Sequence, residues 1–383
     1  MKVLLSAGMI QGGRSGVGRY VIALSEALVR EQAPAVDLFV AGLAADRALF
    51  PWLRDARWVT IPAGMSGGAA NLWWHQVSLN RVVKSLGIEL VHIPSYRRMM
   101  YHCAVPQVAT IHDCAPFILR EKYDWLRGFF GRVIVPVIAR RVQHVIAVSE
   151  TTAKDVVRWM EVPAAKVTAV PNGIDHEMFR PPDAAAVAEF RQRLQLPDRF
   201  FLYVARLEHP AKNHLRLIRA FEGLAAAGEF DGHLVLPGAP WHGSEIITAA
   251  VAASPFRDRI RLTGFVTNAD LPLWYAAAEA LVFPSLMEGF GLPLLEAQAC
   301  GTRIACADAT SLPEVAGPAG ILFNGLDEPA IAAAMRTLAT MPPEERRQRE
   351  AAGQQWAAGF TWSAHAAAAV RIYREASVSP TQP

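Results

Sequence analysis

Short apolar runs that alternate with longer helical patterns constrain the fold of this chain more than any other feature. Each run is apolar throughout rather than at every second residue, which is typical of strands covered on both faces. Strands that alternate with helices form parallel sheets through right-handed crossovers. A first series of strands is expected at residues 3–7, 37–41, 58–61, 90–93, 107–111, 144–148 and 167–170. A second series is expected at residues 200–204, 233–236, 259–262, 280–283, 303–306 and 321–323.

The break between the two series predicts two domains, as does a length of 383 residues at roughly 100–200 residues per domain. We expect doubly wound α/β domains over 1–177 and 200–360. Residues 178–199 contain three prolines and a polar, Ala-rich helical pattern, which indicates a linker. A helix over about 361–376, with apolar anchors at Trp362 and Tyr373, is expected to pack back on the first domain. Ligands of such folds bind at the carboxyl ends of the strands.

Composition excludes several classes of protein. With 52% hydrophobic and 19% charged residues, the chain is not disordered. Its four cysteines are scattered and form no CxxC pair, which excludes a disulfide scaffold or a zinc site and favours reduced thiols in the cytoplasm. No two aspartates stand two residues apart, so we expect no metal. Because no apolar run is long enough for a bilayer helix or a signal peptide, a cytoplasmic location is expected.

The charge is distributed unevenly along the chain. Residues 1–180 contain 21 Lys and Arg against 14 Asp and Glu, a net of +7, and the remainder has 17 against 21, a net of −4. The first half therefore either faces an anionic surface or substrate, or reflects drift in surface charge. The overall net charge of +3 gives no indication of a nucleic-acid partner.

The strongest functional motif is a glycine-rich loop between a strand and a helix, Glu288-Gly-Phe-Gly-Leu-Pro-Leu-Leu-Glu296. Pro293 suits the first turn of a helix, where its missing N–H costs nothing. Backbone N–H groups at such a helix start bind phosphate readily, and the two glutamates are suitable acceptors for the hydroxyls of a hexose and a ribose. A capped surface helix after a hinge loop explains the same spacing.

Two cations occupy the first strand–helix loop of the second series, where this type of fold places a phosphate. Arg206 has the fork geometry to hold phosphate bidentately, and Lys212 offers a point charge. Solvated loop cations are the alternative.

The first series carries two weaker motifs. The loop after its first strand is glycine-rich but fits neither the dinucleotide nor the phosphate-loop fingerprint. Gly13 and Gly16 therefore indicate either close approach of the backbone to a ligand or a flexible loop. His112 stands beside Asp113 at a strand end and is either part of a structural pair or a residue of the cleft.

Residues 120–141 interleave aromatic and basic side chains. The candidates for contact with an acceptor or a membrane are Trp125, Arg127, Phe129 and Arg132. Such a segment either lies on an anionic leaflet near a lipid-linked glycan or forms a core-facing helix with a solvated basic stripe.

Ser66 lies in Gly-Met-Ser-Gly-Gly, which formally fits the nucleophile elbow of serine hydrolases. The surrounding Gly/Ala run is loose, whereas the elbow is one tight turn, so a hydrolase is the least favoured interpretation.

Taken together, these segments resemble the retaining GT-B glycosyltransferases of family 4 over nearly the whole chain. The matching segments occur in the family's order and spacing: EGFGLPLLEAQACG with its two glutamates eight residues apart, ARLEHPAKNH, VPNGID, LTGFV at 262–266 and SLPEVAG at 311–317. GGRSGVGRY and IHD further resemble the mannosyltransferase-like branch. The residue before Lys212 is alanine, where the family more often has a basic residue.

The resemblance implies a role for each matching residue. Arg206 and Lys212 would bind the donor pyrophosphate and act with Glu288 and His112 in catalysis, the latter two beside the transferred sugar. Glu296 would hold the ribose and Val266 would contact the base. The donor-binding set is Gly13, Gly16, Val266, Phe290, Gly291, Leu292 and Glu296. Since cations and a helix N-terminus can stabilise a leaving diphosphate, neither a metal nor a cofactor is implied.

We therefore expect a metal-independent hexosyltransferase that moves a sugar, mannose-like by preference, from a GDP- or UDP-linked donor. The expected acceptor is a glycan or lipid-linked glycan of cell-surface polysaccharide synthesis, met by peripheral contact at the inner face of an anionic membrane. The alternatives are a non-catalytic member of the fold that binds a nucleotide or glycan, and a hydrolase that uses Ser66.

Overall fold

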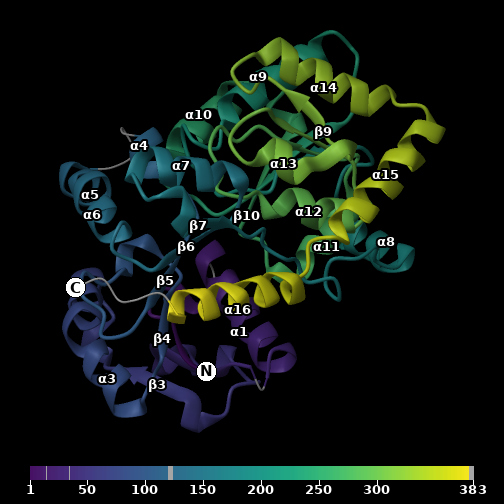
Figure 1. The fold of residues 1–383 in the computed structure, drawn as a ribbon. Helices are drawn as coiled ribbons and strands as arrows, with labels where there is room; N and C mark the ends of the chain where they lie inside the picture. Colours follow the sequence, from purple (N-terminus) through teal and green to yellow (C-terminus); the bar gives the residue numbers. More distant parts are fainter. Residues whose placement is uncertain (14, 34, 120–123, 379–383) are drawn as a thin grey trace. The chain divides into compact units, whose positions relative to one another are not determined.

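The computed structural model describes residues 1–13, 15–33, 35–119 and 124–378, which fall into two compact units (Figure 1). The first unit comprises Met1–Gly173 and the C-terminal stretch from Thr361, and the second comprises Ile174–Phe360. Residues 178–199 lie in the second unit, where α8 (Ala184–Arg193) packs against α11 (Leu271–Ala277) through an edge contact between Phe190 and Trp274.

The described residues of the first unit form a seven-stranded parallel sheet in the order β3-β2-β1-β4-β5-β6-β7. Its strands are β1 (Lys2–Ser6), β2 (Asp37–Leu43), β3 (Trp58–Ile61), β4 (Leu90–Ile93), β5 (Gln107–Ile111), β6 (His144–Ala147) and β7 (Val167–Ala169). Its helices are α1 (Gly16–Glu31), α2 (Gly68–Trp73), α3 (Leu79–Leu86), α4 (Ala115–Ile118), α5 (Trp125–Phe129), α6 (Val135–Ala139), α7 (Glu150–Met160) and α16 (Trp362–Val378). Two π-helical turns, Trp74–Ser78 and Phe130–Ile134, join α2 to α3 and α5 to α6.

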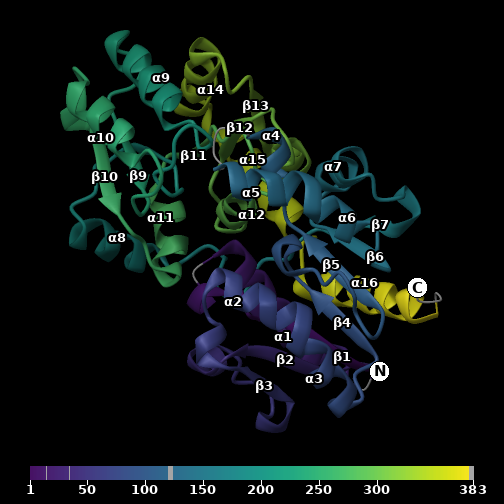
Figure 2. The same cartoon turned by 90° about the vertical axis from the view of Figure 1, so that its left-hand side faces the viewer.

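The described residues of the second unit form a six-stranded parallel sheet in the order β10-β9-β8-β11-β12-β13, and Figure 2 shows β9 and β10 side by side at its edge. Its strands are β8 (Phe200–Leu202), β9 (His233–Pro237), β10 (Ile260–Gly264), β11 (Ala280–Phe283), β12 (Ile304–Ala307) and β13 (Ile321–Phe323). Besides α8 and α11, its helices are α9 (His214–Ala226), α10 (Ser244–Ala253), α12 (Leu292–Ala299), α13 (Leu312–Ala316), α14 (Glu328–Thr340) and α15 (Pro343–Ala357). The predicted fold class, two doubly wound parallel sheets, is confirmed.

The apolar strands arise because both faces of each sheet are covered. In β1, Val3 and Leu5 point into a core shared with α1 and α16, while Leu4 points into the opposite core with residues of α3 and α6. Successive side chains of a strand alternate between faces, so two covered faces require an unbroken apolar run. Each such leucine or valine contributes roughly 1.5–3 kcal/mol on burial.

A buried chain of polar side chains anchors α16 to the first sheet. The Tyr20 hydroxyl lies 2.9 Å from the Thr110 hydroxyl and 3.0 Å from His365 Nε2. His92 joins the same Thr110 hydroxyl at 2.8 Å to the Tyr373 hydroxyl at 2.7 Å. Because a buried polar group without a partner costs free energy, these bonds specify where the helix lies on α1, β4 and β5 (Figure 1).

Across the described residues, no helix combines the length and the apolar character needed to span a bilayer.

The buried histidines make the first unit sensitive to acid. Burial lowers the pKa of His75, His112 and His365 to about 4 and that of His92 to about 3. The unfolded chain therefore takes up protons below about pH 6.5, whereas the folded chain does not until about pH 4. We expect the free energy of unfolding to fall as the pH drops from 6.5 towards 4, by up to about 1.4 kcal/mol per pH unit for each histidine.

Urea unfolding followed by tryptophan fluorescence at pH 7.5, 6.0 and 5.0 measures this decline. His92→Gln should reduce the pH slope, and His102→Gln, at an exposed position, should leave the slope unchanged. A flat profile between pH 6.5 and 5 would contradict the prediction.

Candidate active site

The predicted cations and glutamate of the second unit lie on the two loops at which the strand order of its sheet reverses. From β8 the chain continues to β9 on one side, and from β11 it continues to β12 on the other. The helices that follow β8 and β11 therefore cover opposite faces, which opens a crevice between the two strands' carboxyl ends. The loop with Arg206 and Lys212 follows β8, and the loop with Glu288 follows β11.

Hydrogen bonds between the two loops hold them in register. The Leu286 N–H donates to the Ala211 carbonyl at 3.0 Å. Asn213 adopts a left-handed backbone with φ of 58°, and its side-chain amide donates to the carbonyls of Pro284 at 3.1 Å and Gly325 at 2.7 Å. The Tyr203 hydroxyl donates to the Lys212 carbonyl at 2.8 Å. Lys212 is thus carried on a backbone that is bonded to the β11 loop itself.

The side chains of Lys212 and Glu288 form an ion pair, with Nζ 2.5 Å from Oε1. Each side chain is 17% exposed, so the pair is screened less than a surface pair while it still reaches solvent. The arrangement places one cation and one carboxylate at the carboxyl ends of β8 and β11. A cation in this position can bind phosphate oxygens, and the carboxylate can accept bonds from hydroxyl groups.

Arg206 is positioned by the loop that follows β9, which sequence reasoning did not single out. Backbone bonds join Leu207 to Ala239 and Trp241 to Leu207, and the Arg206 guanidinium carbon lies 4.6 Å from the Trp241 ring centroid. At Gly238 an added Cβ would lie 1.8 Å from the Ala205 carbonyl oxygen, so only glycine permits the two loops to approach. Trp241 was missed because an aromatic residue in a loop carries no periodic pattern.

The glycine-rich loop before α12 is fastened from the opposite side. The Ser311 hydroxyl lies 3.0 Å from the Glu288 carbonyl and 2.8 Å from the Phe290 carbonyl, and the Glu288 N–H donates to Thr310 Oγ1 at 3.1 Å. Gly291 is the N-cap of α12 with φ of 107°, a conformation that L side chains rarely adopt. The backbone leading into α12 therefore starts at the carboxyl end of β11, beside Glu288.

The remaining predicted donor residues of the second unit lie in α12 and in the loop after β10. Leu292 begins α12, and Glu296 lies one turn further. The Glu296 side chain is buried and accepts a bond from the Tyr275 hydroxyl at 2.8 Å. Val266, half-buried, follows β10, whose end at Gly264 is bonded to Gly238 of the β9 loop. The loops after β8, β9, β10 and β11 thus lie together at the carboxyl ends of the strands.

The predicted residues of the first unit lie at the carboxyl ends of β1 and β5. Gly13 has φ of 75°, and Gly16 begins α1 with open space around it. Gly18 is the position where a side chain does not fit, since an added Cβ would lie 2.5 Å from the Ile10 carbonyl oxygen. Sequence reasoning named Gly13 and Gly16 but not Gly18.

His112 does not pair with the neighbouring aspartate. Its Nε2 lies 3.1 Å from the Pro94 carbonyl oxygen, and its ring meets Tyr20 edge-on at 4.8 Å. Asp113 instead accepts a bond from the Ala115 N–H at 3.0 Å. Because burial lowers the pKa of His112 to about 4, the ring is neutral at pH 7 and can donate or accept one hydrogen bond at each nitrogen.

The basic aromatic segment exposes its apolar side chains. Residues 120–123 lie outside the described residues, and α5, the π-helical turn and α6 run on from Trp125. Four exposed apolar residues of this stretch are spaced four residues apart, and two more lie next to members of this row: Trp125, Phe129, Val133 and Val137, with Leu126 and Ile134. Arg127 is also exposed, while Arg132 folds back towards the Pro116 carbonyl. The structure therefore favours a surface element over a core-facing helix.

Ser66 does not form a nucleophile elbow. It is exposed, follows a short 3-10 turn after the edge strand β3 and has ordinary right-handed helical backbone angles. The nearest histidine along the chain, His75, is bonded to Ser6 at 2.7 Å. Among the described residues, no cluster of three or more His, Cys, Asp and Glu side chains forms a metal site.

Both halves of the chain match known families. Residues 14–178 match the family described as Glycosyltransferase Family 4, and residues 198–341 match Glycosyl transferases group 1. The chain is 29% identical over 269 residues to O-antigen chain mannosyltransferase B of Escherichia coli, covering 70% of each protein. It is 31% identical over 263 residues to the serotype-specific mannosyltransferase WbdA of Escherichia coli, covering 67% of this chain and 32% of WbdA, so it spans about a third of that relative.

A solved structure shares the fold across nearly all of the chain. Anabaena Alr3699/HepE in complex with UDP and glucose superposes with a TM-score of 0.76 at 18% sequence identity, covering 98% of this chain and 100% of that one. At this identity the likeness shows the fold alone.

Trp241 is expected to hold Arg206 ready for an anionic ligand. Trp241→Ala should weaken UDP or GDP binding about two- to fivefold, because an exposed cation–π contact contributes about 0.5–1 kcal/mol. Trp241→Phe should retain most of the affinity. Titration calorimetry measures both, with Trp73→Ala, an equally exposed tryptophan of the first unit, as the control. Equal affinity in Trp241→Ala and wild type would show that the stacking has no such role.

Proposed function

The chain belongs to the family 4, group 1 glycosyltransferases, and on this premise we propose that it is a retaining hexosyltransferase that transfers mannose from a nucleoside diphosphate to a growing glycan. The observation that carries the proposal is the Lys212–Glu288 pair at the switch point of the second sheet, with Arg206 on the same loop as Lys212. The family uses nucleotide sugars, and the preference for mannose follows from two relatives named as mannosyltransferases.

The proposed chemistry is the cleavage of a glycosyl–phosphate bond, which leaves negative charge on a nucleoside diphosphate. Arg206 and Lys212 offer two cations for that charge, and the start of α12 offers backbone N–H groups and the positive end of the helix dipole. Preorganised charges of this kind stabilise the leaving group without a metal. Glu288, which holds Lys212 in the free protein, is the proposed acceptor for a hydroxyl of the donor sugar.

His112 is the proposed contact of the first unit with the transferred sugar. Because its ring is neutral at pH 7, it would act through hydrogen bonds rather than as a charge. Glu296 and Val266 remain the proposed contacts of the ribose and the base, with Gly13, Gly16, Phe290, Gly291 and Leu292 supplying backbone groups. Retention of the anomeric configuration would follow from attack on the face that the diphosphate leaves.

The proposed acceptor is a glycan or lipid-linked glycan, approached at an anionic membrane. The exposed apolar residues of α5 and α6 support this part, since they stand beside cations such as Arg127 on the basic half of the chain. Apolar side chains flanked by cations are the pattern of a helix that lies in the lipid interface.

Transfer assays with GDP- and UDP-linked hexoses test the proposed reaction, after a thermal-shift screen with UDP, GDP and ADP identifies the base. Lys212→Ala should lower kcat by about 10² or more, the typical loss when one preorganised charge at a developing anion is removed. Arg219→Ala, which removes an exposed cation from α9 of the same unit, should leave the rate unchanged. Near wild-type transfer by a folded Lys212→Ala variant would refute the assignment. Nucleotide binding without transfer from any donor would support a non-catalytic member of the fold.

Flotation with phosphatidylcholine vesicles, with and without phosphatidylglycerol, tests the membrane contact. We expect binding only to the anionic vesicles, and less of it at high salt. Leu126→Ser should reduce flotation severalfold, whereas Leu326→Ser, a leucine of similar exposure in the second unit, should not. Equal flotation of both variants, or none for the wild type, would exclude this surface as the point of contact.

A further inference from the structure

A cavity lies at the amino ends of the strands of the second sheet, whereas the candidate active site lies at their carboxyl ends. Its volume is about 420 Å³, within the range of about 300–1,000 Å³ typical of small-molecule sites. Asp198, Glu279 and Arg303 line it and come just before β8, β11 and β12, whereas the active-site loops follow β8 and β11. The length of the strands therefore separates this cavity from the donor site.

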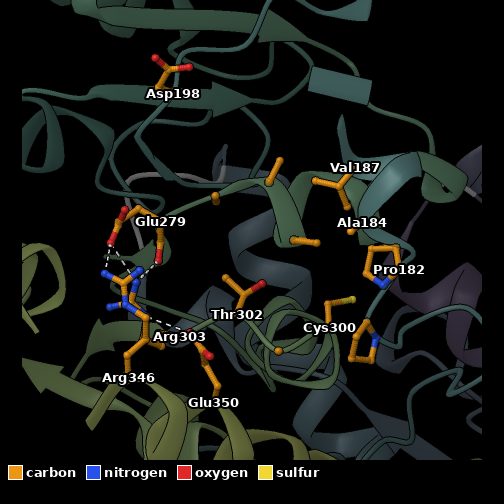
Figure 3. Close-up of a pocket in the computed structure, with 15 residues that line it drawn as sticks. Pro182, Ala184, Val187, Asp198, Glu279, Cys300, Thr302, Arg303, Arg346 and Glu350 are labelled. Atoms are coloured by element: carbon orange, nitrogen blue, oxygen red, sulfur yellow. Dashed lines mark hydrogen bonds and ion pairs between the residues drawn. The ribbon is translucent and has the colours of Figure 1, made fainter. Parts of the chain in front are cut away.

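One end of the cavity is charged (Figure 3). Glu279 receives three guanidinium groups, from Arg199 at 3.3 Å and from Arg303 and Arg346 at 2.9 Å each. The contact with Arg346 holds the ends of the strands to α15, and a bond from Arg303 to the Leu338 carbonyl at 2.7 Å holds them to α14. Glu279 is thereby engaged as a structural group.

Other polar groups of the cavity wall have capacity left. Thr302 is 6% exposed, and its hydroxyl has no hydrogen-bond partner among the described residues. Within the same described part of the chain, Nε of Arg346 also has none. The Glu350 carboxylate lies 3.5 Å from Arg303 Nε and keeps a side chain that is 31% exposed. Thr302 Oγ1 and Arg346 Nε are shielded from solvent, so the groups open to a ligand are the Glu350 carboxylate and the Arg346 guanidinium, whose side chain is 38% exposed. The wall is therefore suited to a ligand that both donates and accepts hydrogen bonds.

The other end of the cavity is apolar. Pro182, Ala184 and Val187, at the start of α8, form this wall, with Cys300 beside them (Figure 3). The carboxylates of Asp198, Glu279 and Glu350 and the guanidinium groups of Arg303 and Arg346 nearly balance in charge. An anion would face Glu350 and a cation would face Arg346. A neutral ring with hydroxyl groups on its edge and C–H groups on its faces fits both ends.

We propose that this cavity is a second sugar-binding site, which holds a neutral pyranose residue of the glycan away from the donor site. That the sugar belongs to the glycan being elongated rests on the proposed function, while the affinity for a sugar rests on the cavity alone. The site would retain a long acceptor between transfers. Its loss would lower the rate with polymeric acceptors and leave the rate with a short acceptor unchanged.

The test measures binding of methyl α-mannoside, methyl α-glucoside and methyl α-galactoside by saturation-transfer NMR and calorimetry. The donor site is filled with UDP or GDP throughout. The wild type should bind at least one glycoside in the presence of the nucleotide. Ala184→Trp, which fills the cavity from an exposed helix start, should weaken binding about tenfold or more. Ala185→Trp, the next exposed residue of α8 and not part of the wall, is the matched control.

Glu350→Gln keeps the size of the side chain and removes the charge of the exposed acceptor in the wall. It should weaken the glycoside about three- to tenfold, the loss of one charge-assisted hydrogen bond. Equal binding by Ala184→Trp and Ala185→Trp, displacement of the glycoside by the nucleotide, or binding of inorganic phosphate with no glycoside would each overturn the proposal. Transfer activity in a protein that binds no glycoside would refute the proposed role of the cavity and leave the proposed function standing. Glycoside binding without transfer from any donor would refute the proposed function and leave the sugar site standing.

Discussion

The bonds between the loop after β8 and the loop after β11 hold the candidate active site together. Lys212 and Glu288 are 76 residues apart in sequence, and their side chains meet because Asn213 and Ala211 are bonded to the backbone around Leu286. A lysine side chain has many rotamers, and fixing it costs conformational entropy. In this site the neighbouring backbone is already ordered by other bonds, so the ion pair has to order only the two side chains.

The same principle applies to Arg206 and to the glycine-rich loop. Trp241 and Gly238 bring the β9 loop against the Arg206 loop, and Ser311 brings the β12 loop against Glu288. Each functional group therefore stands on one loop and is steadied by a second. Loops of this type are suited to carry function on a rigid scaffold. In the first unit buried bonds fasten α16 in a similar way, since His365 is bonded to Tyr20 of α1 and Tyr373 to His92 of β4.

The carboxyl ends and the amino ends of the strands in the second sheet have different surroundings. The former are called the carboxyl edge here and the latter the amino edge. At the carboxyl edge, charged groups reach solvent beside glycine backbone and a helix start, an arrangement suited to an anionic ligand that arrives and leaves. At the amino edge, Glu279 and three arginines are largely occupied with one another and hold α15 in place. The mildly acidic charge of this half gives no indication of either site, because local geometry outweighs net charge at hydrogen-bond distances.

The sequence by itself determined the strands, their parallel arrangement and the family, because unbroken apolar runs such as the one around Leu4 follow from burial on both faces and the glycine and proline spacing before α12 follows from backbone geometry. It also identified Arg206, Lys212 and Glu288 as the charged groups of the loops. Only the tertiary structure decided which groups meet: that Glu288 pairs with Lys212, that Trp241 stacks on Arg206, that Asp113 accepts a bond from Ala115, and that Trp125 and Phe129 are exposed. Such contacts join residues from separate loops, and a loop's path depends on bonds to other loops rather than on the local pattern of its own residues.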